Sequence, residues 1–92
     1  GASLDEIAVS AAVFPNPSTS NFTIELESQL DNPELEIYNV MGQKVTGHFS
    51  IDEKLSNGTS FGINGSNVSR GNYLFVIYSN GEVVTDGKIS LR

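Results

Sequence analysis

Hydrophobic and polar residues alternate with a period of two along much of this chain. Phe22, Ile24 and Leu26 are separated by polar residues, and Leu35 and Ile37 alternate with two glutamates. Successive side chains of a β-strand point to opposite faces, so this alternation is typical of strands with one buried and one solvated face. No segment shows the i, i+3, i+4, i+7 spacing of an amphipathic helix, and we therefore expect little or no helix.

Three more segments are predicted to be strands. Residues 45–49 keep the alternation and predict a strand that is interrupted at Gly47. Residues 73–78 are apolar at both odd and even positions, which indicates a central strand covered on both faces. A final strand is expected over residues 82–91, with Gly87 marking a β-bulge within it.

Asparagine and glycine mark the turns between these strands. Asn80-Gly81 lies between two strand patterns and predicts a type I′ hairpin, because both residues accept positive φ at low cost. Asn57-Gly58 predicts a further turn, within a longer hairpin. Gly42 is expected to adopt a left-handed conformation between two strands.

Two prolines near the start of the chain predict a stiff connector. Pro15 and Pro17 lack the backbone N–H that a β-ladder requires, so strand pairing is expected to stop there. A first strand over about residues 7–14 then ends at this connector. From the connector the chain is expected to cross to another sheet.

The number and spacing of these strands predict an all-β fold. About seven short strands at intervals of roughly 8–15 residues are typical of an antiparallel β-sandwich. Tyr73 opens the most apolar strand, as does the tyrosine of an immunoglobulin-like sandwich whose hydroxyl bonds back to upstream backbone. Phe75 takes the inward position that a cysteine holds in an antibody domain. We therefore expect an immunoglobulin-like antiparallel β-sandwich.

Composition excludes several classes of protein. The chain has 92 residues, which suits one small domain, and its net charge is −6. Nucleic-acid binding needs cations that displace counterions from phosphates, so this acidic chain is not expected to bind nucleic acid. No apolar stretch approaches the ~20 residues of a transmembrane helix. With no cysteine and a single histidine, His48, we expect no disulfide scaffold, no metal site and no cofactor.

The chain begins at Gly1 without a methionine, and we expect it to be part of a longer protein. Residues 1–8 are interpreted as a linker upstream of the first strand, and residues 9–92 as the domain.

No catalytic constellation is evident, so we do not expect an enzyme. His48 and Asp52 are four residues apart, which on one strand separates them by about 13 Å. A solvent-facing histidine beside a turn is the favoured interpretation. The solvated faces of two strands carry carboxylates that resemble a paired-acid or calcium site, although such residues more often keep a sheet face soluble: Glu25, Glu27, Glu34 and Glu36.

Four separated segments carry a resemblance to a known family. They are Phe14-Pro15-Asn16-Pro17-Ser18, residues 36–45 with the turn Met41-Gly42-Gln43, residues 71–76 beginning Gly71-Asn72-Tyr73, and residues 87–92 with Lys88-Ile89. In this order they resemble the type A C-terminal sorting domain of the type IX, or Por, secretion system of Bacteroidetes. The resemblance runs from about Val9 to Arg92. It departs at residues 47–67, where the usual short strand reads Phe61-Gly62-Ile63-Asn64.

This resemblance implies a sorting signal. The parent cargo protein would cross the inner membrane, fold in the periplasm and be read by the outer-membrane translocon and its shuttle protein. A sortase-like peptidase would then remove the domain, cutting near or before residues 1–7. The cargo would end on the cell surface or be secreted.

Within the domain, two groups of residues are singled out. The last strand and its free end offer a receptor an edge to extend or a terminus to clamp, so the expected readout is Lys88, Ile89, Leu91 and Arg92. The alternative is that Ile89 and Leu91 belong to the core and Lys88 is a solvated edge charge. Residues expected to fix the backbone of the family motifs are Pro15, Asn16, Pro17, Gly42, Gly71 and Tyr73.

Two other functions stay open. An adhesive or carbohydrate-binding sandwich would display exposed aromatic rings, for which Tyr38 and Tyr78 are the candidates. An inert spacer would tolerate loss of its last residues without any effect on export.

Overall fold

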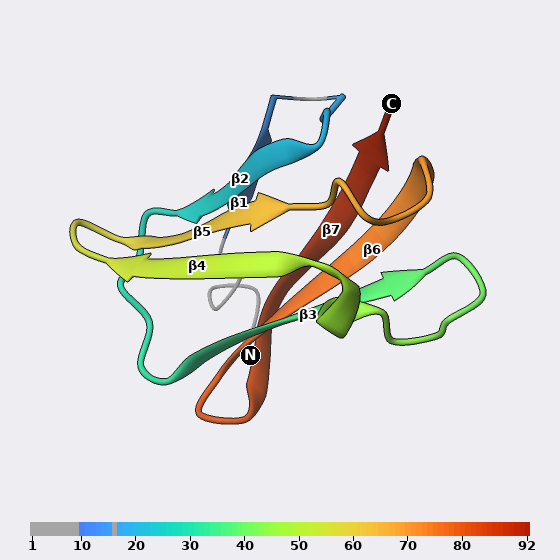
Figure 1. The fold of residues 1–92 in the computed structure, drawn as a ribbon. Coiled ribbons are helices and arrows are strands. Elements are labelled where there is room, and N and C mark those ends of the chain that lie inside the picture. Colours follow the sequence, from blue (N-terminus) through green and yellow to red (C-terminus); the bar gives the residue numbers. More distant parts are fainter. Residues whose placement is uncertain (1–9, 16) are drawn as a thin grey trace.

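Two antiparallel β-sheets pack face to face in the computed structural model, which describes residues 10–15 and 17–92 (Figure 1). One sheet has the strand order β1-β2-β5-β4 and the other has the order β3-β6-β7. The expected immunoglobulin-like sandwich of about seven strands is confirmed. The strands are β1 (Ala11–Phe14), β2 (Asn21–Leu26), β3 (Pro33–Asn39), β4 (Ser50–Leu55), β5 (Thr59–Asn64), β6 (Gly71–Ser79) and β7 (Glu82–Leu91).

The core lies between the sheets and is built by the alternation seen in the sequence. Every buried position of β2, β3 and β6 holds an aliphatic or aromatic residue, and the residues between them point away from the core. The buried hydrophobic residues are Phe22, Ile24, Leu26, Leu35, Ile37, Phe49, Phe61, Ile63, Tyr73, Phe75, Ile77, Ile89 and Leu91.

The predicted turns are confirmed. Asn80 has φ 53° and Gly81 has φ 82°, as a type I′ hairpin between β6 and β7 requires. Gly42 has φ 85° in the turn after β3. Asn57-Gly58 closes the hairpin of β4 and β5.

The first strand ends where the prolines begin. β1 covers Ala11–Phe14 and pairs with β2, and the Phe14–Pro15 peptide bond is cis. The chain then crosses to the other sheet, where Ser18 forms an isolated parallel bridge with Leu91 of β7. The upstream part of the predicted strand, the expected linker 1–8 and Asn16 lie outside the described residues.

Residues 45–49 do not form the predicted strand. Thr46–His48 make one turn of 3₁₀-helix, labelled η2, while the chain passes from one sheet to the other. The Val45 N–H donates to the Ile37 oxygen at 2.8 Å, and the Ile37 N–H donates to Thr46 Oγ1 at 2.8 Å. These bonds hold the turn against β3, and the next strand begins only at Ser50.

The expectation that β6 is covered on both faces is also wrong. β6 is the middle strand of its sheet, but Leu74 on its outer face is 43% exposed. A two-layer sandwich buries one face of each sheet and leaves the other to solvent.

Gly87 is not the bulge in the last strand. The register of β6 and β7 shifts so that Ile77 pairs with Thr85 and Tyr78 pairs with Val83, which leaves Val84 as the extra residue. Gly87 instead lies opposite Phe75, whose ring would be 2.7 Å from a Cβ at position 87. Glycine is needed there for close packing.

Replacing Gly87 by alanine should therefore destabilise the domain. We expect Gly87→Ala to lower the free energy of unfolding by about 1–3 kcal/mol, because the new methyl group overpacks the core. Urea unfolding followed by circular dichroism measures this change. Gly47→Ala is the matched control, since a Cβ at position 47 meets no heavy atom within 4 Å. Equal unfolding midpoints for the two variants would contradict the packing argument.

Candidate functional site

The four segments that stand out in the sequence meet at one end of the sandwich. Asn39, at the end of β3, pairs with Tyr73 near the start of β6. Gly71 pairs with Leu91 at the end of β7, and Leu91 also bridges to Ser18. The loops before β2 and before β6 thus flank the end of the chain (Figure 1), and the turn after β3 adjoins the loop before β6.

Ser18 ties the proline connector to the last strand. The Ser18 N–H donates to the Ser90 oxygen at 2.8 Å, and the Arg92 N–H donates to the Ser18 oxygen at 3.0 Å. The Ser18 hydroxyl donates to the Pro15 oxygen at 2.7 Å, and the residue is fully buried. No pattern in the sequence indicates this role of Ser18, because the role depends on a contact between distant segments.

The expected tyrosine corner is present beneath this end. The Tyr73 hydroxyl donates to the Ser69 oxygen at 2.5 Å and so fixes the loop before β6. Phe49 packs edge-to-face on Tyr73, with 5.5 Å between ring centroids, and edge-to-face on Phe22 at 6.5 Å. This row of rings supports the loops from inside the core.

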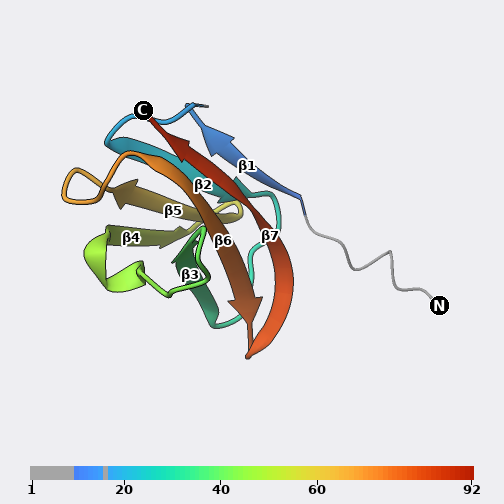
Figure 2. The ribbon, with the colours of Figure 1, turned by 90° about the vertical axis from the view of Figure 1, so that its right-hand side faces the viewer.

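β7 forms an edge of the three-stranded sheet. In an antiparallel ladder, alternate residues turn both backbone groups to the same side. The Ser90 oxygen and the Arg92 N–H point to Ser18, on the side of β7 that faces away from β6. By the same alternation, the backbone groups of Asp86 and Lys88 point to that side. β1 runs beside this edge without pairing with it (Figure 2), and no strand of the described residues adds to it beyond the Ser18 bridge.

The residues of the predicted readout fall into two groups. Ile89 and Leu91 are 1% and 3% exposed and belong to the core. Lys88 is exposed on the outer face, opposite Leu74, and Arg92 is exposed at the end of the chain. Among residues 10–15 and 17–92, neither cation forms a salt bridge. Lys88 and Arg92 are therefore the two that a partner reaches without opening the fold.

The residues predicted to fix the backbone are at turns and crossings. Pro15 and Pro17 are exposed in the connector, and Asn16 lies outside the described residues. Gly71 has φ 140°, a conformation that side-chain-bearing residues rarely adopt, just where β6 begins. Gly42 has the left-handed φ noted above.

Most of the cations of the chain stand toward the end of the sandwich at which β7 finishes. The sequence stretches 37–51, 61–74 and 87–92 build this end and contain no Asp or Glu. They hold four of the five Lys and Arg residues, Lys44, Arg70, Lys88 and Arg92. Carboxylates stand close by, because Lys44 is paired with Glu36, and Asp52 and Glu53 lie opposite Gly62 and Phe61. We call this part of the molecule the basic end.

The outer face of the three-stranded sheet carries a polar cluster around Glu36. The Tyr38 hydroxyl donates to Glu36 Oε1 at 2.5 Å, and Lys44 Nζ lies 3.3 Å from Glu36 Oε2. The Tyr38 bond, with Lys44 and the Tyr78 hydroxyl, lowers the pKa of Glu36, and the same bond raises the pKa of Tyr38. Tyr38 and Tyr78 are both half-buried and share Glu36 instead of standing free as a sugar platform.

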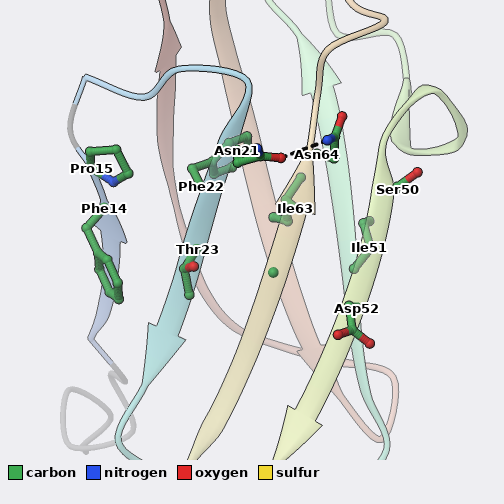
Figure 3. A pocket seen from close by; sticks show the side chains of 11 residues that line it. Phe14, Pro15, Asn21, Phe22, Thr23, Ser50, Ile51, Asp52, Ile63 and Asn64 are labelled. Carbon is green, nitrogen blue, oxygen red and sulfur yellow. Dashed lines mark hydrogen bonds between the residues drawn. The ribbon is translucent and has the colours of Figure 1, made fainter.

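A hollow of about 510 Å³ lies on the outer face of the four-stranded sheet (Figure 3). Phe14 and Pro15 line one side of it and Asp52 the other, and Gly62 pairs with both Thr23 and Asp52 between them. At its upper end the Asn64 side-chain amide donates to Asn21 Oδ1 at 2.7 Å. Phe14 is an exposed aromatic residue that the sequence pattern assigned only to the end of a strand.

The other candidates from the sequence are not assembled into a site. His48 lies in η2 and Asp52 in β4, so the single strand assumed for them does not exist. The described residues contain no group of three or more His, Asp or Glu placed to hold a metal ion. No helix of the described chain is long and apolar enough to span a membrane.

Comparison with known proteins agrees with the geometry. The family model described as "Secretion system C-terminal sorting domain" matches residues 12–91. Among solved structures, the crystal structure of the Lin-41 filamin domain has a TM-score of 0.54 and 9% identity, over 89% of this chain and 91% of that one. At this identity the likeness shows the immunoglobulin-like fold alone. No curated protein matches the sequence.

The Glu36 cluster gives a pH-dependent signature. We expect the absorbance titration of the phenols to show one tyrosine ionising above the usual pKa of about 10, because ionising Tyr38 removes its bond to Glu36. Glu36→Gln should return that titration to the usual range. The lowered pKa of Glu36 also means that its carboxylate stabilises the fold at neutral pH and that this contribution is lost as the pH falls through the lowered value. A Glu36→Gln titration identical to that of the parent would refute the assignment.

Proposed function

The chain belongs to the family of type IX secretion system C-terminal sorting domains, and we propose that it directs its parent protein through the type IX outer-membrane translocon. The observation that carries the proposal is the edge of β7, which forms no ladder with the neighbouring β1 and leads to Arg92 at the basic end. All four segments of the family resemblance gather there. A receptor that reads this end finds them on one surface.

Recognition rests on the side chains and backbone that the folded domain leaves free. Lys88 and Arg92 supply positive charge, and the backbone of Asp86 and Lys88 offers hydrogen-bonding groups for an added strand. Ile89 and Leu91 act through the fold, because their burial holds β7 in place. The translocon and its shuttle protein are the proposed readers of this surface.

Removal of the domain follows recognition in this proposal. A sortase-like peptidase would cut upstream of β1, in residues outside the described chain. The cargo would pass through the periplasm and end on the cell surface or in the medium. In this proposal the domain is the sorting signal of its parent protein and performs no chemistry.

An export assay tests this function. The domain is fused to the C-terminus of a periplasmic reporter in a Bacteroidetes host, and the reporter is followed in periplasm, surface and medium. We expect export of the parent fusion. The double variant Lys88→Glu/Arg92→Glu should be retained in the periplasm, because both cations of the proposed recognition surface become anions. Both side chains are exposed, so the free energy of unfolding should stay within about 1 kcal/mol of the parent value.

Lys54→Glu is the matched control, because Lys54 is an exposed cation on β4, away from the basic end. It should be exported like the parent. Retention of the parent fusion itself would sink the sorting function. Export of Lys88→Glu/Arg92→Glu at the parent level would remove the two cations from the readout. Truncation after Gly87 is a poorer test, since it also deletes Ile89 and Leu91 from the core.

Carbohydrate binding is a second candidate, and the hollow of Figure 3 is the observation that favours it. An exposed aromatic ring beside a carboxylate and side-chain amides is the combination that holds a sugar, with the ring packed against its apolar face. Here Phe14 supplies the ring, and Asp52 and Asn64 supply polar groups.

Glycan binding by Phe14→Ala separates this candidate from sorting. If the hollow binds sugars, Phe14→Ala should lose retention on the bound glycan by about tenfold or more, because the ring supplies most of the apolar contact. Leu55→Ala is the control, since Leu55 is 42% exposed against 44% for Phe14 and lies at the far end of β4. Absence of binding by the parent domain across a glycan array would exclude the candidate.

A further inference from the structure

Two adjacent apolar side chains are displayed on the turn after β3. Val40 is 72% exposed and Met41 is 79% exposed, more than any other large hydrophobic residue in the described part of the chain. Single exposed hydrophobic residues are common on protein surfaces and need no explanation. Two neighbours on one protruding turn form a small apolar knob instead.

The turn that carries the knob is rigid. Asn39 Oδ1 accepts the N–H groups of Met41 and Gln43, each at 3.0 Å, and Asn39 Nδ2 donates to Gln43 Oε1 at 2.8 Å. The backbone closes the same turn, since the Gly42 N–H donates to the Asn39 oxygen at 3.0 Å. A fixed turn loses little conformational entropy when a partner binds it, so its apolar side chains are preorganised for contact.

A hollow of about 440 Å³ adjoins the knob on the basic end. Its lining includes Val40 of the turn and Val68 and Arg70 of the loop before β6. The Arg70 guanidinium is held in place, because it donates to the Gly65 oxygen at 2.6 Å and to the Val68 oxygen at 3.1 Å. Knob, hollow and positive charge therefore occupy one continuous surface.

We propose that this surface is a second docking element, for a folded protein that offers an apolar socket with a carboxylate rim. The socket receives Val40 and Met41, and the rim pairs with Arg70 and the neighbouring cations of the basic end. The inference rests on the proposed sorting function and extends it. The partner that binds β7 and Arg92 also contacts the turn after β3.

One partner can span both elements. Asn39, Tyr73 and Ile89 lie side by side on β3, β6 and β7. Two inter-strand spacings separate the outer strands, which is about 10 Å. A protein interface of ordinary size, about 800 Å² on each partner, covers that distance easily. Contact at two places would also fix the orientation of the domain on its receptor.

A lipid surface fits these observations less well than a protein. Interfacial membrane binding requires a broad apolar face with aromatic residues, whereas the knob has two side chains and no aromatic ring. A protein socket that encloses the two side chains buries more of their apolar surface than a membrane surface would.

The test compares two ways of removing exposed apolar surface from the reporter fusion. We expect Val40→Ser/Met41→Ser to lower the exported fraction by about tenfold or more, because two buried side chains are lost from the interface. Val83→Ser is the matched control: Val83 is 56% exposed, but it lies beside the hairpin at the other end of the molecule. It should be exported like the parent, and thermal unfolding should show all three domains to be equally folded.

Charge at the knob gives an independent readout. A carboxylate-rimmed socket should tolerate Met41→Lys better than Met41→Glu, so export should be lower for the glutamate variant. Export of Val40→Ser/Met41→Ser at the parent level, with the parent fusion exported normally, would overturn the inference and leave the sorting function intact. Retention of the parent fusion would instead defeat the sorting function. Flotation of the isolated domain with anionic phospholipid vesicles, lost in Val40→Ser/Met41→Ser, would assign the knob to a membrane and overturn the protein socket.

Discussion

The sandwich is completed only when its last strand enters the core. Ile89 and Leu91 come from the final four residues of the chain, yet both are buried between the sheets. β6 needs β7 as a partner for its hydrogen bonds, and the Ser18 connector needs Ser90 and Arg92 for its own. Because this last contribution is non-local, the surface at the basic end exists only in the folded domain. A partner that reads it therefore distinguishes a finished domain from an unfinished one.

The sequence was informative wherever one face of a strand is buried and the other is wet. β2 and β3 follow this rule, and the Asn80-Gly81 hairpin and the Gly42 turn follow from residues that accept positive φ. β4 breaks the rule, since Ile51 is its only half-buried residue and the rest of it is exposed. Most of its positions are polar, so it lacks the alternation of a half-buried strand, and the pattern predicts a strand over the preceding turn instead.

Features that depend on how distant segments meet were beyond the sequence pattern. The bulge at Val84 is set by the register of β6 against β7, and Gly87 is explained by the ring of Phe75 across the ladder. The outer face of β6 was misjudged because Leu74 and Val76 are apolar although the sheet leaves them at the surface. For the candidate site, the family motifs indicated Lys88, Arg92 and the Gly42 turn, but their common location and the part played by Ser18 required the fold.

The Ser18 bridge also determines how the domain responds to mechanical load. Suppose a receptor holds the end of β7 while the chain ahead of β1 is drawn in the opposite direction. The two backbone bonds of Ser18 join strand segments that run parallel, so the pull acts along the strands and loads both bonds together. Bonds loaded in shear must fail at the same time, whereas the bonds of a peeled hairpin fail one by one. Once β1 is pulled from β2, the Ser18 contact is therefore the next to resist separation of the connector from β7.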